Sequence, residues 1–133
     1  NLMRHKKQLA TIDTQDALIG NRAYDLASLI DDVRFKSNKK LKEKIYNYYL
    51  KINKNKINTS VLLNDFEILS VTRNMKIIGI FARLASRDKK RAYLKLIPHA
   101  WKLIELRIQS NQIFDGLRRI LHINFSKKIR NSR

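Results

Sequence analysis

Apolar residues recur every three or four positions along most of this chain, and that spacing restricts it to a mainly helical fold. The longest such run covers about Val61–Ala85. Its apolar positions are Leu62, Phe66, Leu69, Ile77, Ile80, Phe81 and Leu84. Residues with this spacing lie on one face of a helix, so that face is expected to pack against the rest of the protein. Thr59 or Ser60 can cap its start, and a break, if there is one, would fall near residues 72–74.

Shorter segments show the same period and predict helices at about 23–34, 40–53, 91–109 and 112–122. Pro98 should kink the third of these helices or divide it in two. The expected buried faces are Leu26, Leu29, Ile30 and Val33; Leu41, Ile45, Tyr48, Tyr49 and Ile52; and Ile113, Leu117, Ile120 and Leu121. Trp101 and the tyrosines at 46, 48 and 49 are interpreted as core residues, and Asn21 as an N-cap.

The first twelve residues follow a different pattern, which predicts a short β-hairpin. Its arms would be Asn1–Met3 and Gln8–Ile12, with residues 4–7 as the turn, because the β-branched Thr11 and Ile12 favour a strand. We therefore expect one domain with three parts: hairpin and loop at 1–20, a helical subdomain at 21–125, and a frayed basic tail at 126–133. The predicted fold is mainly α, a short N-terminal β-hairpin followed by four to five helices.

Composition limits the kinds of protein that this chain can be. With 133 residues it is long enough for one modest domain, and it has no cysteine for a disulfide or a thiolate metal site. We find no apolar run long enough to cross a membrane and no signal peptide, so we expect a cytoplasmic protein with no membrane partner. The chain begins with Asn1, and we interpret it as a fragment of a longer protein.

The formal net charge is +18, and it is unevenly distributed. Residues 1–32 carry −1, whereas residues 33–133 carry +19. Such a charge can indicate a nucleic-acid partner, but much of it is Lys scattered among Asn and Ile, as in residues 51–58, which is typical of AT-rich genomes. No nucleic-acid-binding motif accompanies it. We favour compositional drift over a polyanion-binding surface and do not expect a nucleic-acid partner.

An acidic cluster stands out against this basic background. Its five carboxylates are Asp13, Asp16, Asp25, Asp31 and Asp32. Crowded carboxylates destabilise one another unless a cation balances them, so either a metal binds here or the cluster faces solvent and partners. The three histidines, His5, His99 and His122, are too far apart in sequence for a metal site and are predicted to be non-catalytic.

Two separated motifs resemble one family of kinases. The segment Ile12–Leu29, which reads IDTQDALIGNRAYDLASL, resembles the metal-binding segment of the aminoglycoside phosphotransferase-like (choline-kinase-like) small-molecule kinases. GIFARL at 79–84, Arg87-Asp88, Tyr93-Leu94 and Ile97-Pro98 are similar to a run in the bacterial branch that phosphorylates N-acetylmuramate and N-acetylglucosamine at the anomeric position. The resemblance covers about residues 1–110 and implies the C-terminal lobe of a protein-kinase-like fold.

The resemblance also implies particular roles. Asn1 and Asp13 would hold the Mg²⁺ ions on ATP, and Asp16 would approach the same ion or shape the loop. Asp25 would brace the catalytic loop. Arg83 is a candidate for binding an anionic or a sugar substrate, although an arginine at the edge of the core, with its charged end in solvent, is the simpler interpretation. Thr14 departs from the family pattern, which has an aromatic residue at that position.

The catalytic base is expected to be an Asp upstream of Asn1, together with the nucleotide-binding lobe. This chain alone should therefore be inactive. The predicted function is the C-terminal part of an ATP- and Mg²⁺-dependent phosphotransferase acting on a small-molecule hydroxyl, such as that of an amino sugar in cell-wall recycling. Two alternatives stay open: a basic helical module that binds RNA or an acidic partner, and a decayed paralogue without activity.

Overall fold

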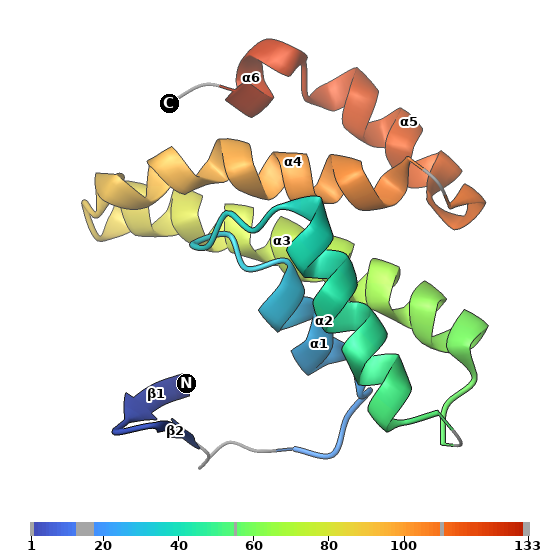
Figure 1. Ribbon diagram of the computed structural model, residues 1–133. Coiled ribbons are helices and arrows are strands. Elements are labelled where there is room, and N and C mark those ends of the chain that lie inside the picture. The colour runs from blue at the N-terminus through green and yellow to red at the C-terminus, as the bar shows by residue number, and fades with distance from the viewer. Residues whose placement is uncertain (1, 13–17, 55, 110, 132–133) are drawn as a thin grey trace.

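The computed structural model describes residues 2–12, 18–54, 56–109 and 111–131. Within these ranges the chain forms a two-stranded hairpin and then six α-helices with two short 3₁₀ segments (Figure 1). The helices are α1 (Ala23–Ile30), α2 (Lys39–Ile52), α3 (Thr59–Arg87), α4 (Ile97–Ile108), α5 (Asp115–Asn124) and α6 (Lys127–Asn131); the 3₁₀ segments are η1 (Arg91–Leu96) and η2 (Gln112–Phe114). The predicted mainly helical class with an N-terminal hairpin is confirmed.

The hairpin consists of β1 (Leu2–His5) and β2 (Gln8–Thr11), which pair antiparallel with Leu2 opposite Thr11. The turn is shorter than predicted, since Arg4 and His5 belong to the strand. Lys6 makes the tight turn possible with a positive φ of 53°. All of β2 is exposed, so backbone pairing, rather than burial of a face, defines this hairpin.

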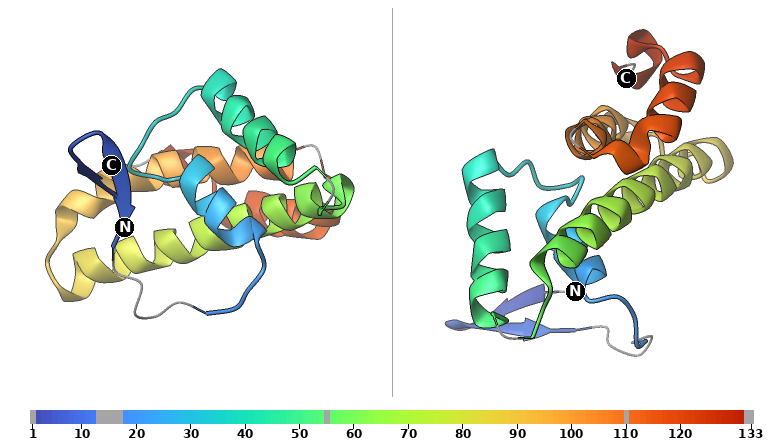
Figure 2. Two further views of the ribbon diagram at one scale, coloured as in Figure 1. Left: turned by 60° about the horizontal axis from the view of Figure 1, so that its bottom comes forward. Right: turned by 90° about the vertical axis from the view of Figure 1, so that its right-hand side faces the viewer.

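α3 is the longest helix, and the core lies along its length. Three apolar clusters follow one another on it: the first packs α1 and α2 against its N-terminal half, the second packs α4 and α5 against its middle, and the third packs η1 and α4 against its C-terminal half. Figure 2 shows α4 running beside α3 in both views. The side chains buried from α3 include Leu62, Phe66, Val71 and Phe81.

Asn58, rather than Thr59 or Ser60, caps α3. Its Oδ1 accepts hydrogen bonds from the backbone N–H groups of Ser60 and Val61, at 3.1 and 3.2 Å. The helix is continuous from Thr59 to Arg87, so it has no break near residue 72. Thr72 and Asn74 are accommodated without one because each side chain donates to a carbonyl one turn earlier: Thr72 Oγ1 to Ile68 O and Asn74 Nδ2 to Ser70 O, both at 2.9 Å.

α1 is shorter than predicted, ending at Ile30 rather than near residue 34. Its buried face is Ala23, Leu26, Ala27 and Ile30. Leu29, which was predicted to be buried, is 52% exposed, and Val33 is buried after the helix has ended. The helix ends at its C-cap Asp31, whose backbone leaves the helical region with a φ of −111° and a ψ of 41°. The Asp31 carboxylate meets partners from other helices.

The buried face of α2 agrees only in part with the predicted one, since Ile45 and Tyr49 pack inward as expected. Ile45, Tyr46, Tyr49 and Leu50 pack on the first cluster, and the Tyr46 ring meets Phe66 edge-on at 5.4 Å. Three of the predicted face residues, Leu41, Tyr48 and Ile52, are exposed instead. The helix is anchored at its start by Asn38, whose Oδ1 accepts from the Leu41 N–H at 2.8 Å.

Pro98 divides the segment 91–109, as predicted. Residues 91–96 form η1, and α4 begins at Ile97 with Pro98 in its first turn, where a missing N–H costs little. Trp101 is buried, as expected, together with Ala100, Leu103, Ile104 and Ile108.

The C-terminal residues do not fray, contrary to the prediction for the tail, at least over residues 126–131. α6 folds back so that Arg130 is only 4% exposed. Its guanidinium donates to Phe125 O, Leu121 O and Glu105 Oε1, each at 2.8 Å, and lies 5.2 Å from the centre of the Trp101 ring. In the preceding α5, Leu121 is buried, whereas Ile120, which was predicted on the same face, is exposed. Ile113, also predicted on that face, lies in η2 and is exposed.

Candidate functional site

The predicted metal ligands Asn1, Asp13 and Asp16 lie outside the described residues. The structure does describe the strand that precedes Asp13, which ends at Thr11, and the segment that follows Asp16, from Leu18 onward. Across the ranges that are described, we find no group of three or more His, Asp or Glu side chains placed to hold a metal ion. The predicted ligands therefore stay predictions.

The start of α1 is fixed by Asn21, close to the predicted site in sequence. Asn21 Oδ1 accepts from the Ala23 N–H at 2.9 Å, and its Nδ2 donates to Asp65 Oδ2 on α3 at 2.7 Å. Asn21 thus does the capping that was predicted, although the formal N-cap position is Arg22. The segment that follows Asp13 and Asp16 in sequence is therefore tied to α3, the longest helix, at Asn21.

Asp25, the predicted brace, lies in the first turn of α1 and is exposed. Its carboxylate is well placed to interact favourably with the helix dipole. A contact with the catalytic loop would involve residues upstream of this chain. The bracing role is therefore still a prediction.

Arg83, the candidate substrate-binding residue, lies on the C-terminal half of α3 and is exposed. Its neighbours in the GIFARL motif build the end of the helix: Phe81 is buried and its ring lies 5.1 Å from that of Tyr93. Leu84 O accepts from the backbone N–H groups of both Asp88 and Lys90, at 3.1 and 3.0 Å. The GIFARL motif therefore lies in the last turns of α3, and the carbonyl of its Leu84 holds the turn that leads to η1.

Asp31 accepts more side-chain hydrogen bonds than any other carboxylate that the structure describes. The sequence placed it in the acidic cluster but predicted no role for it. It is completely buried. Its carboxylate accepts from Lys42 Nζ at 2.7 Å, from Ser70 Oγ at 2.6 Å, and from Arg107 Nε and Nη2 at 2.8 and 3.1 Å. These partners come from α2, α3 and α4, so one side chain at the end of α1 joins four helices.

The electrostatics of this hub favour the ionised carboxylate. Burial acts to raise the pKa of Asp31, but hydrogen bonds from Arg107, Lys42 and Ser70 and the Arg107 charge outweigh it, and the pKa is lowered. Arg107 is further held by the Phe66 ring, whose centre lies 4.8 Å from the guanidinium carbon. The hub is fully paired, which is the arrangement expected of a structural ion pair.

A signal for this hub was present in the sequence. Arg107 follows Leu103 by four residues and Ile104 by three, so it falls on the buried face of its own helix. Ser70 likewise follows Phe66 by four residues on α3. Polar residues at core positions of different helices require one another as partners.

His99 lies near the hub on α4. Its Nε2 is buried and meets no hydrogen-bond partner among the described residues. Burial, together with the positive charges of Lys42, Lys36 and Lys102, lowers the pKa of His99, so the neutral form is favoured. Nothing in this geometry gives His99 a catalytic partner, and it remains predicted to be non-catalytic.

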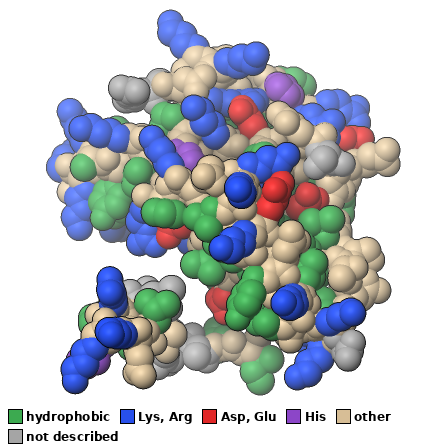
Figure 3. Space-filling model, viewed as in Figure 1, with side chains coloured by type: hydrophobic (Ala, Val, Ile, Leu, Met, Phe, Trp, Pro, Cys, Tyr) green, Lys and Arg blue, Asp and Glu red, His purple; other side chains and the backbone are tan. Residues whose placement is uncertain are grey.

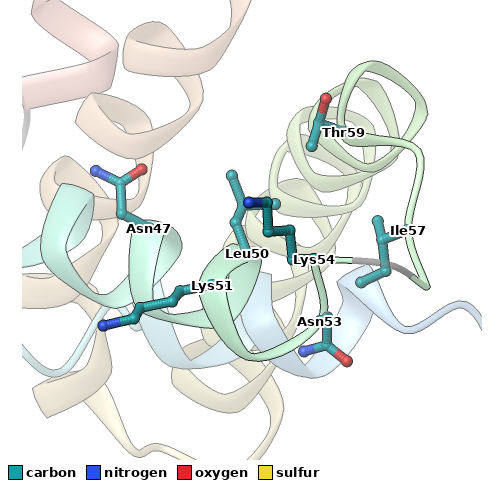
Figure 4. Close-up of a pocket in the computed structure, with 7 residues that line it drawn as sticks. All are labelled: Asn47, Leu50, Lys51, Asn53, Lys54, Ile57 and Thr59. Carbon is teal, nitrogen blue, oxygen red and sulfur yellow. The ribbon is translucent and has the colours of Figure 1, made fainter.

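Two open pockets of about 250 Å³ each lie where α2 ends and α3 begins. In the first, Asn47 and Lys51 from α2 lie on the opposite side from Ile57 and Thr59 (Figure 4). The second borders the start of α1 and is lined by Gly20, Asn21, Arg22, Lys56, Ile57, Asn58, Val61, Leu62 and Asp65. Both pockets are open to solvent, and none of the charged side chains that line them is buried.

Comparison with known proteins identifies relatives of one kind. No protein-family model matches the chain. It is 33% identical over 103 residues to the N-acetylmuramate/N-acetylglucosamine kinase of Neisseria meningitidis, 32% over 111 residues to that of Pseudomonas aeruginosa, and 28% over 99 residues to that of Caulobacter vibrioides. These matches take in 74%, 79% and 74% of this chain, but 31%, 32% and 27% of the respective relatives.

The chain thus spans about a third of the length of the curated relatives that it matches. Among its described helices, none combines the length and the apolar character that crossing a bilayer requires. Over about three quarters of its length, this chain is similar to the N-acetylmuramate/N-acetylglucosamine kinases.

Proposed function

We propose that this chain is the C-terminal part of an ATP- and Mg²⁺-dependent kinase that transfers the γ-phosphoryl group to a hydroxyl of an amino sugar, of the N-acetylmuramate or N-acetylglucosamine type, in cell-wall recycling. One observation carries the proposal: the chain is similar, over most of its length, to four kinases named for these two sugars. The proposal includes membership of the aminoglycoside phosphotransferase-like family, with this chain as its kinase-like C-terminal lobe.

In this proposal Asn1 and Asp13 hold Mg²⁺, with Asp16 beside them. Carboxylate and amide oxygens are ligands that Mg²⁺ accepts, and one or two carboxylates suffice because the ion keeps several waters. When bound, the ion would neutralise charge on the ATP phosphates. The hairpin supports this assignment. Because Leu2 pairs with Thr11, the start of β1, which follows Asn1, and the end of β2, which leads toward Asp13, lie side by side at the open end of the hairpin.

The other roles are assigned to residues that the structure describes. Asp25 braces the catalytic loop from the first turn of α1, a helix that Asn21 ties to α3. Arg83, exposed on α3, contacts the sugar or anionic substrate. The base Asp and the nucleotide-covering lobe belong to the part of the protein upstream of Asn1, so the 133 residues alone do not transfer phosphate. We place the protein in the cytoplasm, with no nucleic-acid partner.

The test uses the protein made from the whole open reading frame that contains this chain. It is incubated with γ-labelled ATP and Mg²⁺ and offered N-acetylmuramate, N-acetylglucosamine, an aminoglycoside and choline. We expect label on the two amino sugars, loss of transfer when Mg²⁺ is chelated, and no transfer by residues 1–133 alone. Transfer to choline or the aminoglycoside, with neither amino sugar labelled, would refute the proposed acceptor class.

A further inference from the structure

α5 carries more apolar surface than the protein covers. Leu121 is buried, and Leu117 packs beside it in the second core cluster. Ile113, Ile120 and Ile123, in contrast, are 57%, 57% and 81% exposed. Ile123 follows Ile120 by three residues, so these two side chains lie on one edge of α5, beside its buried face. Ile113 lies just before them, in η2. We refer to the three isoleucines as the isoleucine stripe.

Cations flank the isoleucine stripe. Arg119 lies on α5, and Lys127 and Lys128 begin α6; all three are exposed. Asp115 is the one acidic residue in the sequence from 112 to 131, and Arg118 lies 3.2 Å from it. Figure 3 shows Lys and Arg side chains at the edge of the molecule that α5 and α6 form in Figure 1, as well as at its other edges.

This surface is held in place by the body of the protein. Arg130 anchors α6 through Glu105 and two backbone carbonyls, and the Phe125 ring lies 5.2 Å from that of Trp101. The exposed isoleucines therefore project from a packed scaffold rather than from a frayed end. A partner that meets them would not have to order the segment first, which spares it that entropic cost.

Charge and shape together select the partner. A basic helix with an apolar edge is typical of segments that lie on an anionic membrane surface, where the cations are attracted to the lipid headgroups and the apolar side chains enter the interface. A second copy of this chain would bring the same cations face to face. The pockets described above line the ends of α2 and α3 instead, and a fluid bilayer needs no matching groove.

We propose that the isoleucine stripe and Arg119, Lys127 and Lys128 dock this protein on the surface of an anionic phospholipid bilayer, with α5 lying in the plane of the interface. This surface association revises the expectation of no membrane partner and is independent of the proposed kinase activity. α5 and α6 lie on the opposite side of α4 from α1, α2 and the hairpin, so docking would leave that side open (Figures 1 and 2).

Co-sedimentation with phospholipid vesicles tests the proposal. The protein should sediment with vesicles of phosphatidylglycerol mixed with phosphatidylcholine, and not with phosphatidylcholine alone. The double variant Ile120→Ser/Ile123→Ser should weaken binding roughly tenfold, since two exposed apolar side chains leave the interface. Lys127→Ala/Lys128→Ala should weaken it and flatten its salt dependence. Ile52→Ser and Lys40→Ala/Lys44→Ala on α2 are matched controls, because Ile52 is 59% exposed, and they should bind as the unaltered protein does.

Three results would overturn the proposal: no binding to anionic vesicles, equal loss in the α2 controls, or an isoleucine variant that binds normally, which would leave only nonspecific charge. Binding to an acidic polypeptide but not to vesicles would likewise replace the membrane with a protein partner. Because the chain has no cysteine, a polarity-sensitive dye on Ile123→Cys gives a second readout. Its emission should shift to the blue with anionic vesicles, whereas dye on Ile52→Cys should not change.

Discussion

Arg107 on α4 donates two hydrogen bonds, of 2.8 and 3.1 Å, to the carboxylate of Asp31 at the end of α1. The two residues are 76 positions apart in the sequence. Because Lys42 and Ser70 bind the same carboxylate from α2 and α3, this pair fixes how the four helices meet. The segment that follows the predicted metal loop is thereby held on a rigid support.

Replacing Asp31 with Asn should destabilise the protein severely. The change leaves Lys42 and Arg107 without a balancing charge in the interior, which typically costs about 3–5 kcal/mol. Urea unfolding followed by circular dichroism measures the effect. Asp32→Asn is the matched control, because Asp32 pairs with an Arg34 side chain that is 72% exposed, and its loss should change stability by less than about 1 kcal/mol. Equal losses in the two variants would contradict the role assigned to the hub.

Stability should fall in two steps as the pH is lowered. The pKa of His99 is lowered by burial and by neighbouring lysines, so the unfolded chain takes up its proton first, and the stability due to neutral His99 is lost below about pH 6.5. The pKa of Asp31 is also lowered, so its contribution is present above about pH 4 and is lost as the pH falls through the native-state value. Thermal unfolding at a series of pH values measures both steps. His99→Gln should remove the upper step and leave the lower one.

Arg130→Ala should release α6 from the rest of the protein. The change removes three hydrogen bonds and the contact with Trp101, and roughly 1–3 kcal/mol of local stability should be lost. The chain has one tryptophan, so its fluorescence reports on this site directly, and its emission should move to longer wavelength as water reaches the ring. Lys128→Ala, on the same helix but exposed, should leave the spectrum unchanged. An unshifted spectrum for Arg130→Ala would show that α6 does not depend on this anchor.

Asn58→Ala should weaken the start of α3 by about 1 kcal/mol, because the backbone N–H groups of Ser60 and Val61 lose their acceptor. Asn58→Ser supplies another capping oxygen and should retain most of the stability. Equilibrium unfolding of the two variants measures the difference. A Ser variant as unstable as the Ala variant would point to Asn58 acting through the neighbouring pocket rather than as a cap.

How much of this could be predicted depends on which force decides each feature. Helical periodicity located every long helix, and the position of Pro98 predicted the division of the segment 91–109, because both depend on local geometry. The buried face of α2 was predicted only in part. Ile45 and Tyr49 pack inward as expected, but Tyr46 and Leu50 also pack inward in place of Leu41 and Tyr48, because the position of the neighbouring helices decides between them. The docked tail was missed because Arg130 reads as a solvent-exposed cation until Glu105 and Trp101 are seen beneath it.

The candidate site, too, could be predicted from the sequence only in part. Motif resemblance pointed to one kind of kinase, and the relatives found independently are of that kind. The hub at Asp31 was missed because its three partner residues lie on three separate helices, so no pattern within a single helix predicts that they meet. Asn1, Asp13 and Asp16 lie outside the described residues, so their proposed roles depend on chemistry and resemblance alone.

Phosphoryl transfer by the Asp13→Asn variant tests the central claim most directly. In the protein made from the whole open reading frame, this change should lower the rate of transfer from ATP to N-acetylmuramate or N-acetylglucosamine at least about a hundredfold, while the circular dichroism spectrum stays unchanged. Asp115→Asn, at an exposed carboxylate on α5, should transfer at the normal rate. An Asp13→Asn protein that phosphorylates the sugar as fast as the unaltered protein would contradict the proposed magnesium site.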